Sequence, residues 1–126
     1  MPQKVKESDI QQAILEWLAY KRIFHYRNNT GAFPFEYNGK KRYVRFSKKG
    51  SPDIYCIVSC RKIGIIIGIE VKADTGKQSQ DQCEFQREFE AAGGYYCIAR
   101  SIEDVENYIE YALKKTVQNV QELNGN

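Results

Sequence analysis

Two carboxylates and one ammonium group lie at the ends of two neighbouring apolar segments. Asp53 begins the apolar segment at residues 53–59, and Glu70 and Lys72 end a more apolar segment at residues 64–72. The tight connection between the segments predicts a hairpin, which would bring all three polar side chains to one edge of a sheet. Burying charged groups is costly unless they are paired or bind a metal ion, so we expect these residues to serve a function.

The face on which each side chain lies limits this arrangement. Side chains alternate along a strand, so Glu70 and Lys72 share one face, and Asp53 joins them only if it lies opposite residue 70 or 72. A one-residue shift would move Asp53 to the other face, so the sequence predicts an even-numbered loop or a bulge. Loops at residues 61–62, 62–63 or 61–64 satisfy this condition. Gly68 shares the Glu70 face and leaves room there for a ligand backbone, for the first helix or for close packing.

The three side chains together indicate phosphoryl chemistry. Two ionised carboxylates repel each other, and a divalent cation such as Mg²⁺, which prefers oxygen ligands, would offset the repulsion. Such an ion polarises a phosphoryl oxygen and acidifies a bound water. The carboxylates favour the charged form of Lys72, which suits orienting that water and stabilising developing charge better than removing a proton. A salt bridge at the strand ends is the alternative interpretation.

Positive charge is concentrated ahead of this hairpin. Nine of the 19 Lys and Arg residues, but only one of the 16 Asp and Glu residues, lie within residues 21–50, although the net charge of the whole chain is only +3. This pattern predicts contact with a polyanion, and a solvated basic loop is the alternative. The candidate phosphate-binding residues are Arg27, Asn28, Lys40, Lys41, Arg42, Arg45, Lys48 and Lys49. For Arg27 and Asn28, a role in the turn at residues 28–31 is nearly as well supported.

The first half of the chain predicts a helix followed by short strands. Ser8 and Gln11 have the spacing of a capping box, and apolar residues recur at helical spacing through residues 8–20. A short strand is expected at residues 23–27, a loop or short strand at 33–38, a hairpin turn at Asn38-Gly39 and a strand at 42–47. The aromatic residues Phe33 and Phe35, together with Tyr37, could form a dimer surface, a DNA surface or both.

The second half predicts a central strand packed between helices. Residues 64–72 are apolar on both faces, which is typical of a strand buried on both sides. A second capping box, at Ser79 and Gln82, opens a helix that extends to about residue 92, and a strand follows at residues 95–100. Ser101 would cap a last helix, with a polar tail that frays over about residues 116–126. The order is α, three or four strands, α, β, α, which predicts one α/β domain with a mixed sheet over residues 1–126, with a polar lead-in at residues 1–7.

The composition argues against a zinc-binding protein and against a membrane protein. The chain of 126 residues is 42% apolar and 28% charged, which is ordinary for a globular domain. Its four cysteines form no C-x-x-C pair and it has one histidine, which argues against a zinc site. Without a signal sequence or an apolar run of about 20 residues, we expect a cytoplasmic protein that does not enter a membrane.

The motifs around the hairpin resemble those of the PD-(D/E)XK nuclease superfamily. The resemblance is closest to the free-standing phage and bacterial members of the VRR-NUC family of virus-type replication-repair nucleases, and it covers roughly residues 5–110. The matching motifs are Glu7 with Ile10-Gln11, Arg27-Asn28-Asn29-x-Gly31, Gly50-x-Pro52-Asp53, Ile69-Glu70-Val71-Lys72, Gly76-Lys77-x-Ser79-x-x-Gln82 and Gly93-Gly94. Each motif is short, and their order makes the set fairly specific.

The resemblance implies a fold and a role for each residue. The fold would be a PD-(D/E)XK-like mixed sheet flanked by helices in αβββαβα order. Asp53, Glu70 and the backbone carbonyl of Val71 would bind the metal, and Glu7 would reach it from the first helix, with Asp9 as the alternative. Lys72 would act on the nucleophile. Gln82 would support the site, with Gln11 a weaker candidate and helix capping the alternative role for Gln82.

The function implied is that of a metal-dependent, structure-specific DNA endonuclease similar to Holliday-junction resolvases. Mg²⁺ would be the cofactor, with Mn²⁺ able to substitute, and the protein would act as a homodimer on branched or four-way DNA. A two-fold dimer would supply two related sites for the two strands to be cut. The alternatives are a catalytically silent nucleic-acid-binding module with the same fold and a sequence-specific restriction-type endonuclease.

Overall fold

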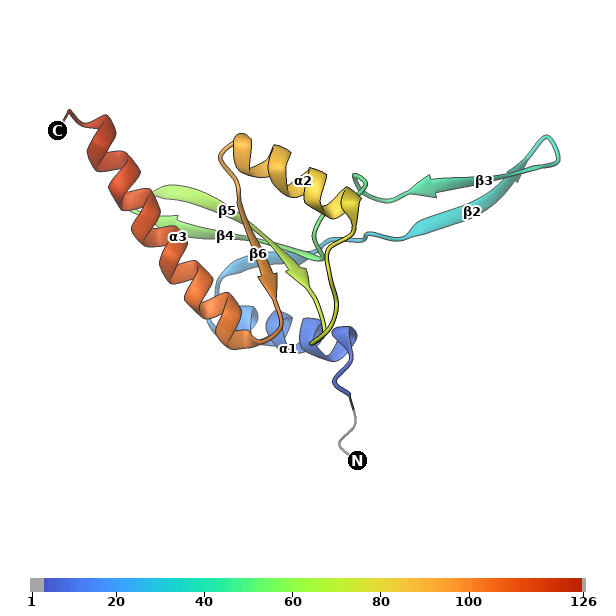
Figure 1. The fold of residues 1–126 in the computed structure, drawn as a ribbon, viewed down its shortest axis with the longest axis horizontal. Coiled ribbons are helices and arrows are strands. Elements are labelled where there is room, and N and C mark those ends of the chain that lie inside the picture. The colour runs from blue at the N-terminus through green and yellow to red at the C-terminus, as the bar shows by residue number, and fades with distance from the viewer. Residues whose placement is uncertain (1–3, 126) are drawn as a thin grey trace.

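The computed structural model describes residues 4–125, which contain three helices and six strands (Figure 1). The elements are α1 (Glu7–Tyr20), β1 (Phe24–Arg27), β2 (Ala32–Tyr37), β3 (Lys40–Arg45), β4 (Ile54–Cys60), β5 (Ile63–Val71), α2 (Gln80–Ala91), β6 (Tyr95–Ala99) and α3 (Ile102–Leu123). The predicted turn at Asn38-Gly39 is confirmed, and the aromatic segment before it is a strand rather than a loop.

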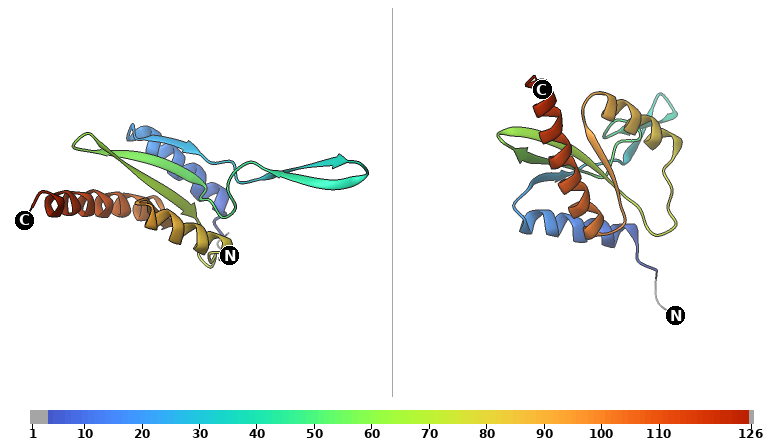
Figure 2. Two further views of the ribbon diagram at one scale, coloured as in Figure 1. Left: turned by 90° about the horizontal axis from the view of Figure 1, so that it is seen from above. Right: turned by 60° about the vertical axis from the view of Figure 1, so that its left-hand side comes forward.

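The strands form two separate sheets. Four of them lie in the order β1-β4-β5-β6, in which β6 runs parallel to β5 and the other pairs are antiparallel. The predicted α/β class with a mixed sheet is therefore confirmed. Strands β2 and β3 pair only with each other, and Figure 1 and the left view of Figure 2 show this hairpin extending away from the larger sheet. With the hairpin set aside, the chain order is a helix, three strands, a helix, a strand and a helix.

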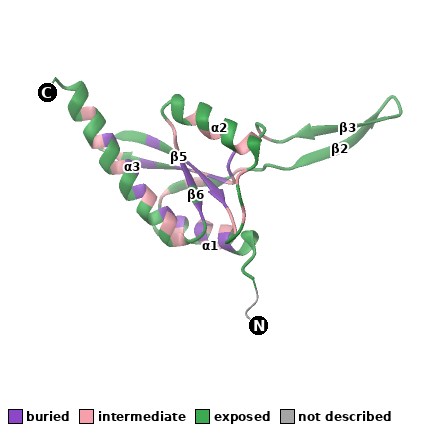
Figure 3. Cartoon of the chain, viewed as in Figure 1, coloured by how far each residue is buried: buried purple, intermediate pink, exposed green. Residues whose placement is uncertain are grey.

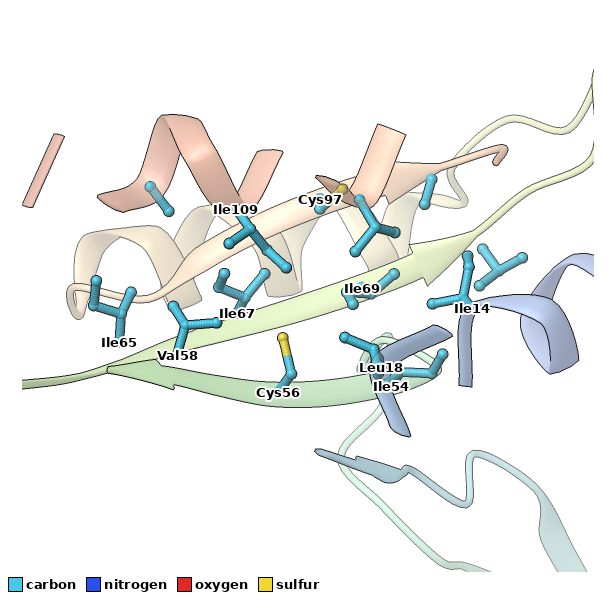
Figure 4. Close-up of a cluster of buried hydrophobic side chains, with 14 of the residues drawn as sticks. Ile14, Leu18, Ile54, Cys56, Val58, Ile65, Ile67, Ile69, Cys97 and Ile109 are labelled. Carbon is cyan, nitrogen blue, oxygen red and sulfur yellow. The ribbon is translucent and has the colours of Figure 1, made fainter. Parts of the chain in front are cut away.

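One face of the four-stranded sheet packs against α1 and α3. Ile67 and Ile69 of β5 are fully buried in a cluster with Ile14 of α1 and Ile109 of α3 (Figure 4). This cluster is the hydrophobic core, and it also includes the inward side chains of β4 and β6. Burial of such side chains stabilises a fold by about 1.5–3 kcal/mol each, so this layer provides the rigid base for the polar end of the sheet.

The opposite face packs against α2. Phe89 of α2 lies with its ring centroid 6.1 Å from that of Tyr55, and Phe85 lies 6.5 Å from Tyr96. A Cβ atom on Gly68 would come within 2.8 Å of Pro52 and 3.5 Å of Phe89, so Gly68 serves close packing. The first helix, one of the neighbours considered for Gly68, lies on the other face.

Helix α2 covers only part of that face. Residues 67–71 of β5 are all buried, whereas Ile66 is 39% exposed. The prediction that this strand is buried on both sides is therefore correct only for its C-terminal half (Figure 3). That half contains Glu70, so the charged end of the strand is its most enclosed part.

The helix ends differ from the sequence prediction in two places. Helix α1 begins at Glu7, because the carbonyl of Lys6 already accepts hydrogen bonds from the N–H groups of Asp9 and Ile10, and no side chain caps it. The predicted cap at Ser8 is wrong, and Glu7 lies in the first helical turn. The capping box of Ser79 is confirmed, and so is the cap at Ser101.

Residues 116–123 of the predicted frayed tail are helical, and residue 126 lies outside the described residues. Helix α3 continues to Leu123, and Thr116 within it is buried. The Thr116 hydroxyl donates to the Ala112 carbonyl at 2.8 Å and lies 3.1 Å from the Tyr95 hydroxyl, which ties the tail to β6. None of the helices in the described residues is long and apolar enough to cross a membrane.

The loop before β4 approaches α2 closely at Gly50. Its φ is +82°, and a Cβ atom there would lie 2.2 Å from the carbonyl oxygen of Asp81. Gly39, in the β2–β3 turn, has a similar φ of +73°, but a Cβ atom there would meet no other atom within 4 Å. The two glycines therefore share a left-handed backbone, which would be strained in any other residue, but differ in available space.

We expect Gly50→Ala to destabilise the protein more than Gly39→Ala. Both variants bear the cost of a left-handed backbone, about 1–2 kcal/mol, but only Gly50→Ala forces the loop away from α2, at a further cost of about 1–3 kcal/mol. Denaturant unfolding of the two variants measures the difference. Equal free energies of unfolding would contradict the close packing of this loop.

Candidate active site

The pairing of β4 with β5 brings the two central carboxylates together. Cys60 pairs with Ile63, which leaves a two-residue loop, Arg61-Lys62, with both residues at positive φ. The same register pairs Ile54 with Ile69, and its continuation by one residue places Asp53 opposite Glu70. The predicted even-numbered loop is confirmed, and both carboxylates lie on the face covered by α2.

Hydrogen bonds fix both the side chain and the backbone of Asp53. Its Oδ2 accepts a hydrogen bond from the backbone N–H of Val71 at 2.8 Å. The Asn28 side chain donates to the Ser51 hydroxyl and the Pro52 carbonyl, each at 2.9 Å, and its backbone N–H donates to the Asp53 carbonyl at 2.7 Å. Asn28 thus positions Asp53, and its amide is occupied within the protein rather than free to meet a phosphate.

Glu70 is the most enclosed ionisable group of the site. It is only 3% exposed, and its Oε2 is buried without a hydrogen-bond partner among the described residues. Burial, followed by the negative charge of Asp53, raises the pKa of Glu70 from its ordinary 4.5 to about 8. Burial also raises the pKa of Asp53, although the hydrogen bond from Val71 opposes it. A buried carboxylate oxygen without a partner beside a second carboxylate fits the needs of a divalent cation.

Gln82 performs both of the roles considered for it. Its amide nitrogen donates to Glu70 Oε1 at 2.9 Å, while its amide oxygen accepts from the backbone N–H of Ser79 at 2.9 Å. The Ser79 hydroxyl completes the capping box by accepting from the Gln82 N–H. The start of α2 therefore fixes the orientation of the Glu70 carboxylate. The described residues show no hydrogen bond from the Gln11 side chain, the weaker candidate, to the site.

Lys72 follows Glu70 on the same face and is nearly buried. Its Nζ lies 3.9 Å from Glu70 Oε1, and its side chain is 12% exposed. Its backbone N–H donates to the Ala99 carbonyl of β6 at 3.0 Å. The ammonium is therefore held beside the two carboxylates, where the sequence predicts it.

Glu7 lies near the site without joining the two carboxylates. Its Oε1 is 3.5 Å from the backbone nitrogen of Ala73, and its negative charge is a minor cause of the raised pKa values of Asp53 and Glu70. Within residues 4–125, no three His, Cys, Asp or Glu side chains are grouped closely enough to hold a metal ion. Glu7 thus lies at the edge of the site, and its role as a ligand stays a prediction; Asp9, the alternative, is exposed.

Arg100 is a site residue that the sequence reasoning missed. Its guanidinium donates to the carbonyls of Ala73 and Gly76, and so ties the loop after β5 to the end of β6. A Cβ atom at Gly76 would lie 3.2 Å from Glu7 Oε1 and 3.3 Å from Lys72 Cδ, so this loop lines the site. The sequence held one signal for Arg100, which is its position directly after β6. Because β6 runs parallel to β5, the two strands end at the same edge of the sheet, and Arg100 is brought next to the residues that follow β5.

A polar hollow of about 240 Å³ opens beside the carboxylates. Asp53 and Glu70 line it together with Arg45, Lys48 and Lys49 from the basic segment, and the first turn of α2 also contributes. Lys48 pairs with Glu88 at 3.1 Å and Lys49 with Asp81 at 3.4 Å; the side chains of Lys48, Lys49 and Glu88 are largely exposed and that of Asp81 is partly exposed. Part of the predicted basic region thus lies at the site.

The other predicted basic residues are exposed and do not line the hollow. Arg27 ends β1 and is exposed. Lys40, Lys41 and Arg42 are exposed on the β2–β3 hairpin, away from the four-stranded sheet. The structure therefore divides the basic segment into a group at the hollow and a group on the hairpin.

No protein-family model matches this chain, and neither does any curated protein or solved structure. Function must therefore be inferred from the site's own residues. They define two apposed carboxylates, one buried at Glu70 and one half-buried at Asp53, together with one lysine and a basic hollow, which together can hold a divalent cation next to an anionic substrate.

Without a divalent cation, we expect the free energy of unfolding to fall as pH rises from about 4.5 to 8. Glu70 binds its proton more tightly in the folded protein, so the stability that this proton confers is complete below its unfolded pKa and lost as pH passes the folded pKa. The slope should reach about 1.4 kcal/mol per pH unit. Urea unfolding in chelator at several pH values measures it.

Glu70→Gln is the matched control for this experiment, since it keeps the shape of the side chain and removes its titration. We expect the variant to lose most of the slope and to be more stable than the wild-type protein at pH 8. A variant that retains the full slope would show that Glu70 is not the group responsible.

Proposed function

We propose that this protein is a metal-dependent DNA endonuclease of the PD-(D/E)XK type, resembling the VRR-NUC branch. The observation that carries the proposal is the pairing of Asp53 with Glu70, whose buried Oε2 has no partner among the described residues, beside the ammonium of Lys72. Structural salt bridges satisfy their charges, whereas this group has one cation nearby for two carboxylates. An added divalent cation would offset the repulsion between the two carboxylates when both are ionised.

Asp53 and Glu70 are the residues that would hold Mg²⁺, with the backbone carbonyl of Val71 as a third ligand. The bound ion supplies Lewis-acid polarisation of a phosphoryl oxygen and lowers the pKa of a bound water. Val71 N–H and the Gln82 amide hold one oxygen of Asp53 and one of Glu70, so the other oxygen of each carboxylate is left for this purpose. Mn²⁺ should substitute, because it also prefers oxygen ligands.

Lys72 would orient the attacking water and stabilise the charge that develops on the phosphorus oxygens. Its Nζ is already held 3.9 Å from Glu70 in a nearly buried position, so little reorganisation is needed when the substrate binds. A fixed ammonium in an enclosed site acts more strongly than the same group in water. Gln82 and Arg100 are positioning residues, since they fix Glu70 and the loop after Lys72.

The hollow would receive the phosphates on either side of the scissile bond. Arg45, Lys48 and Lys49 line it, and the N-terminus of α2 adds a partial positive charge. The exposed pairs of Lys48 with Glu88 and of Lys49 with Asp81 are worth about 0–1 kcal/mol, so phosphates can displace the acidic partners. A polyanion is thus a better match for this hollow than a neutral substrate.

The chain order supports the same proposal. With β2 and β3 set aside, it is the αβββαβα order that the resemblance implies. As for related resolvases, we propose a homodimer acting on branched DNA, because a two-fold dimer supplies two equivalent sites. Such a substrate would place the protein in the cytoplasm.

We expect Mg²⁺-dependent or Mn²⁺-dependent cleavage of DNA that is lost on removal of Lys72. A panel of labelled duplex, flap, single-stranded and four-way substrates at fixed salt measures it. Lys72→Ala should lower the rate by about 10²–10³-fold, the usual loss for one charge-stabilising group. Lys115→Ala, on the exposed part of α3, should match the wild-type rate.

The other outcomes of the panel separate the alternatives. Binding of DNA without metal-dependent cleavage would contradict the nuclease proposal and favour a silent binding module. Cleavage of linear duplex at a single sequence, without preference for branched DNA, would favour a restriction-type enzyme.

A further inference from the structure

The β2–β3 hairpin is an exposed arm with no partner of its own in the described residues. Every residue of both strands is exposed, and Figure 3 shows the hairpin without a buried position. A two-stranded hairpin is at best marginally stable in water when it packs against nothing. The rest of the fold therefore contributes little to the stability of this arm, which points to a role in binding.

The register sorts the arm's side chains into two different faces. Phe33 pairs with Val44, Phe35 with Arg42 and Tyr37 with Lys40, and residues directly opposite each other point the same way. These six residues form one surface, which we call the aromatic face. Its three rings are 58%, 39% and 63% exposed in chain order.

The charge of the aromatic face favours a nucleic acid over a protein surface. The face carries Arg42 and Lys40 and no acid, because the single acid of the arm, Glu36, lies on the opposite face across from Lys41. An apolar protein partner would bury these two cations without compensation, which is costly. A nucleic acid offers phosphates to the cations and flat bases to the rings.

The arm is continuous with the proposed active site. Arg45, the last residue of β3, lines the hollow together with Asp53 and Glu70. Because Arg45 pairs with Ala32, its side chain lies on the face opposite the aromatic face, so the hollow adjoins the base of the arm rather than the rings themselves. Just beyond it, the backbone N–H of Phe46 donates to the Gly31 carbonyl at 3.1 Å, which closes the base of the hairpin. DNA whose phosphates lie in the hollow is thus next to the base of the arm.

We propose that the aromatic face stacks on base faces that are exposed in DNA bound at the site, at a branch point or in a single strand, and so selects branched or locally single-stranded DNA. This inference rests on the proposed function and names the feature of the substrate that it recognises. In a continuous duplex the base faces are stacked on one another, whereas a branch point or single strand exposes them. The cations of the face would meet the phosphates beside those bases.

The test compares a face variant with a control on the other side of the same arm. Phe35→Ala combined with Tyr37→Ala removes two rings from the aromatic face, while Tyr43→Ala removes a ring that is 68% exposed from the opposite face. Fluorescence anisotropy without divalent cation gives the Kd of each protein for a four-way junction and for a linear duplex of the same sequence.

We expect the double variant to lose about tenfold or more of the preference for the junction, because two of the rings that stack on bases are gone. Tyr43→Ala should keep the wild-type ratio of Kd values, and Phe35→Trp should keep or increase it. The same ratio in the wild type and the double variant would overturn the inference. So would a double variant that sediments as a smaller species with an unchanged ratio, because the face would then bind a second copy of the chain.

Cleavage assays on the same proteins separate this inference from the proposed function. If the wild-type protein cuts no DNA but the double variant loses the junction preference, the nuclease proposal fails and the role of the arm stands. If the wild-type protein cuts DNA and the ratio does not change, only the role of the arm fails.

Discussion

The enclosed apposition of Asp53 and Glu70 is the constraint on which the rest of the structure depends. Burial raises the pKa of both carboxyl groups, and the negative charge of Asp53 raises the pKa of Glu70 further, which expresses the cost of ionising both in one poorly hydrated place. The tight Arg61-Lys62 turn fixes this pairing, although both of its residues adopt the left-handed backbone that non-glycine residues disfavour. The buried isoleucines of β5 offset the cost through the hydrophobic core.

The residues that position the two carboxylates also form the start of α2 and the ends of β5 and β6. Gln82 closes the capping box of α2 and orients Glu70 with the same amide. The Val71 N–H that holds Asp53 belongs to the end of β5, and Arg100 joins the ends of two parallel strands. Because each contact is shared with a helix start or a strand end, the site is positioned by regular elements rather than by flexible loops.

The sequence predicts the features of the fold that depend on residues close together in the chain. Strand alternation was enough to require an even loop between β4 and β5, and residue spacing was enough to find the box at Ser79. The cap at Ser8 was wrong because an equally local competitor, the Lys6 carbonyl, starts the helix earlier. Contacts between distant segments, such as those of Asn28 and Arg100, leave no periodic signal in the sequence, and the helical tail depends on packing of Thr116 against β6.

The central claim is that Asp53 and Glu70 together bind a divalent cation, and calorimetric titration with Mn²⁺ or Mg²⁺ tests it most directly. At pH 7 the raised pKa of Glu70 leaves its carboxyl largely protonated, so a cation that binds both carboxylates must displace a proton. Titrations in two buffers with different heats of ionisation measure that release. The account predicts one site per chain with proton release, both lost in Glu70→Gln and Asp53→Asn. Binding of equal affinity in all three proteins, or no binding to the wild type, would contradict it.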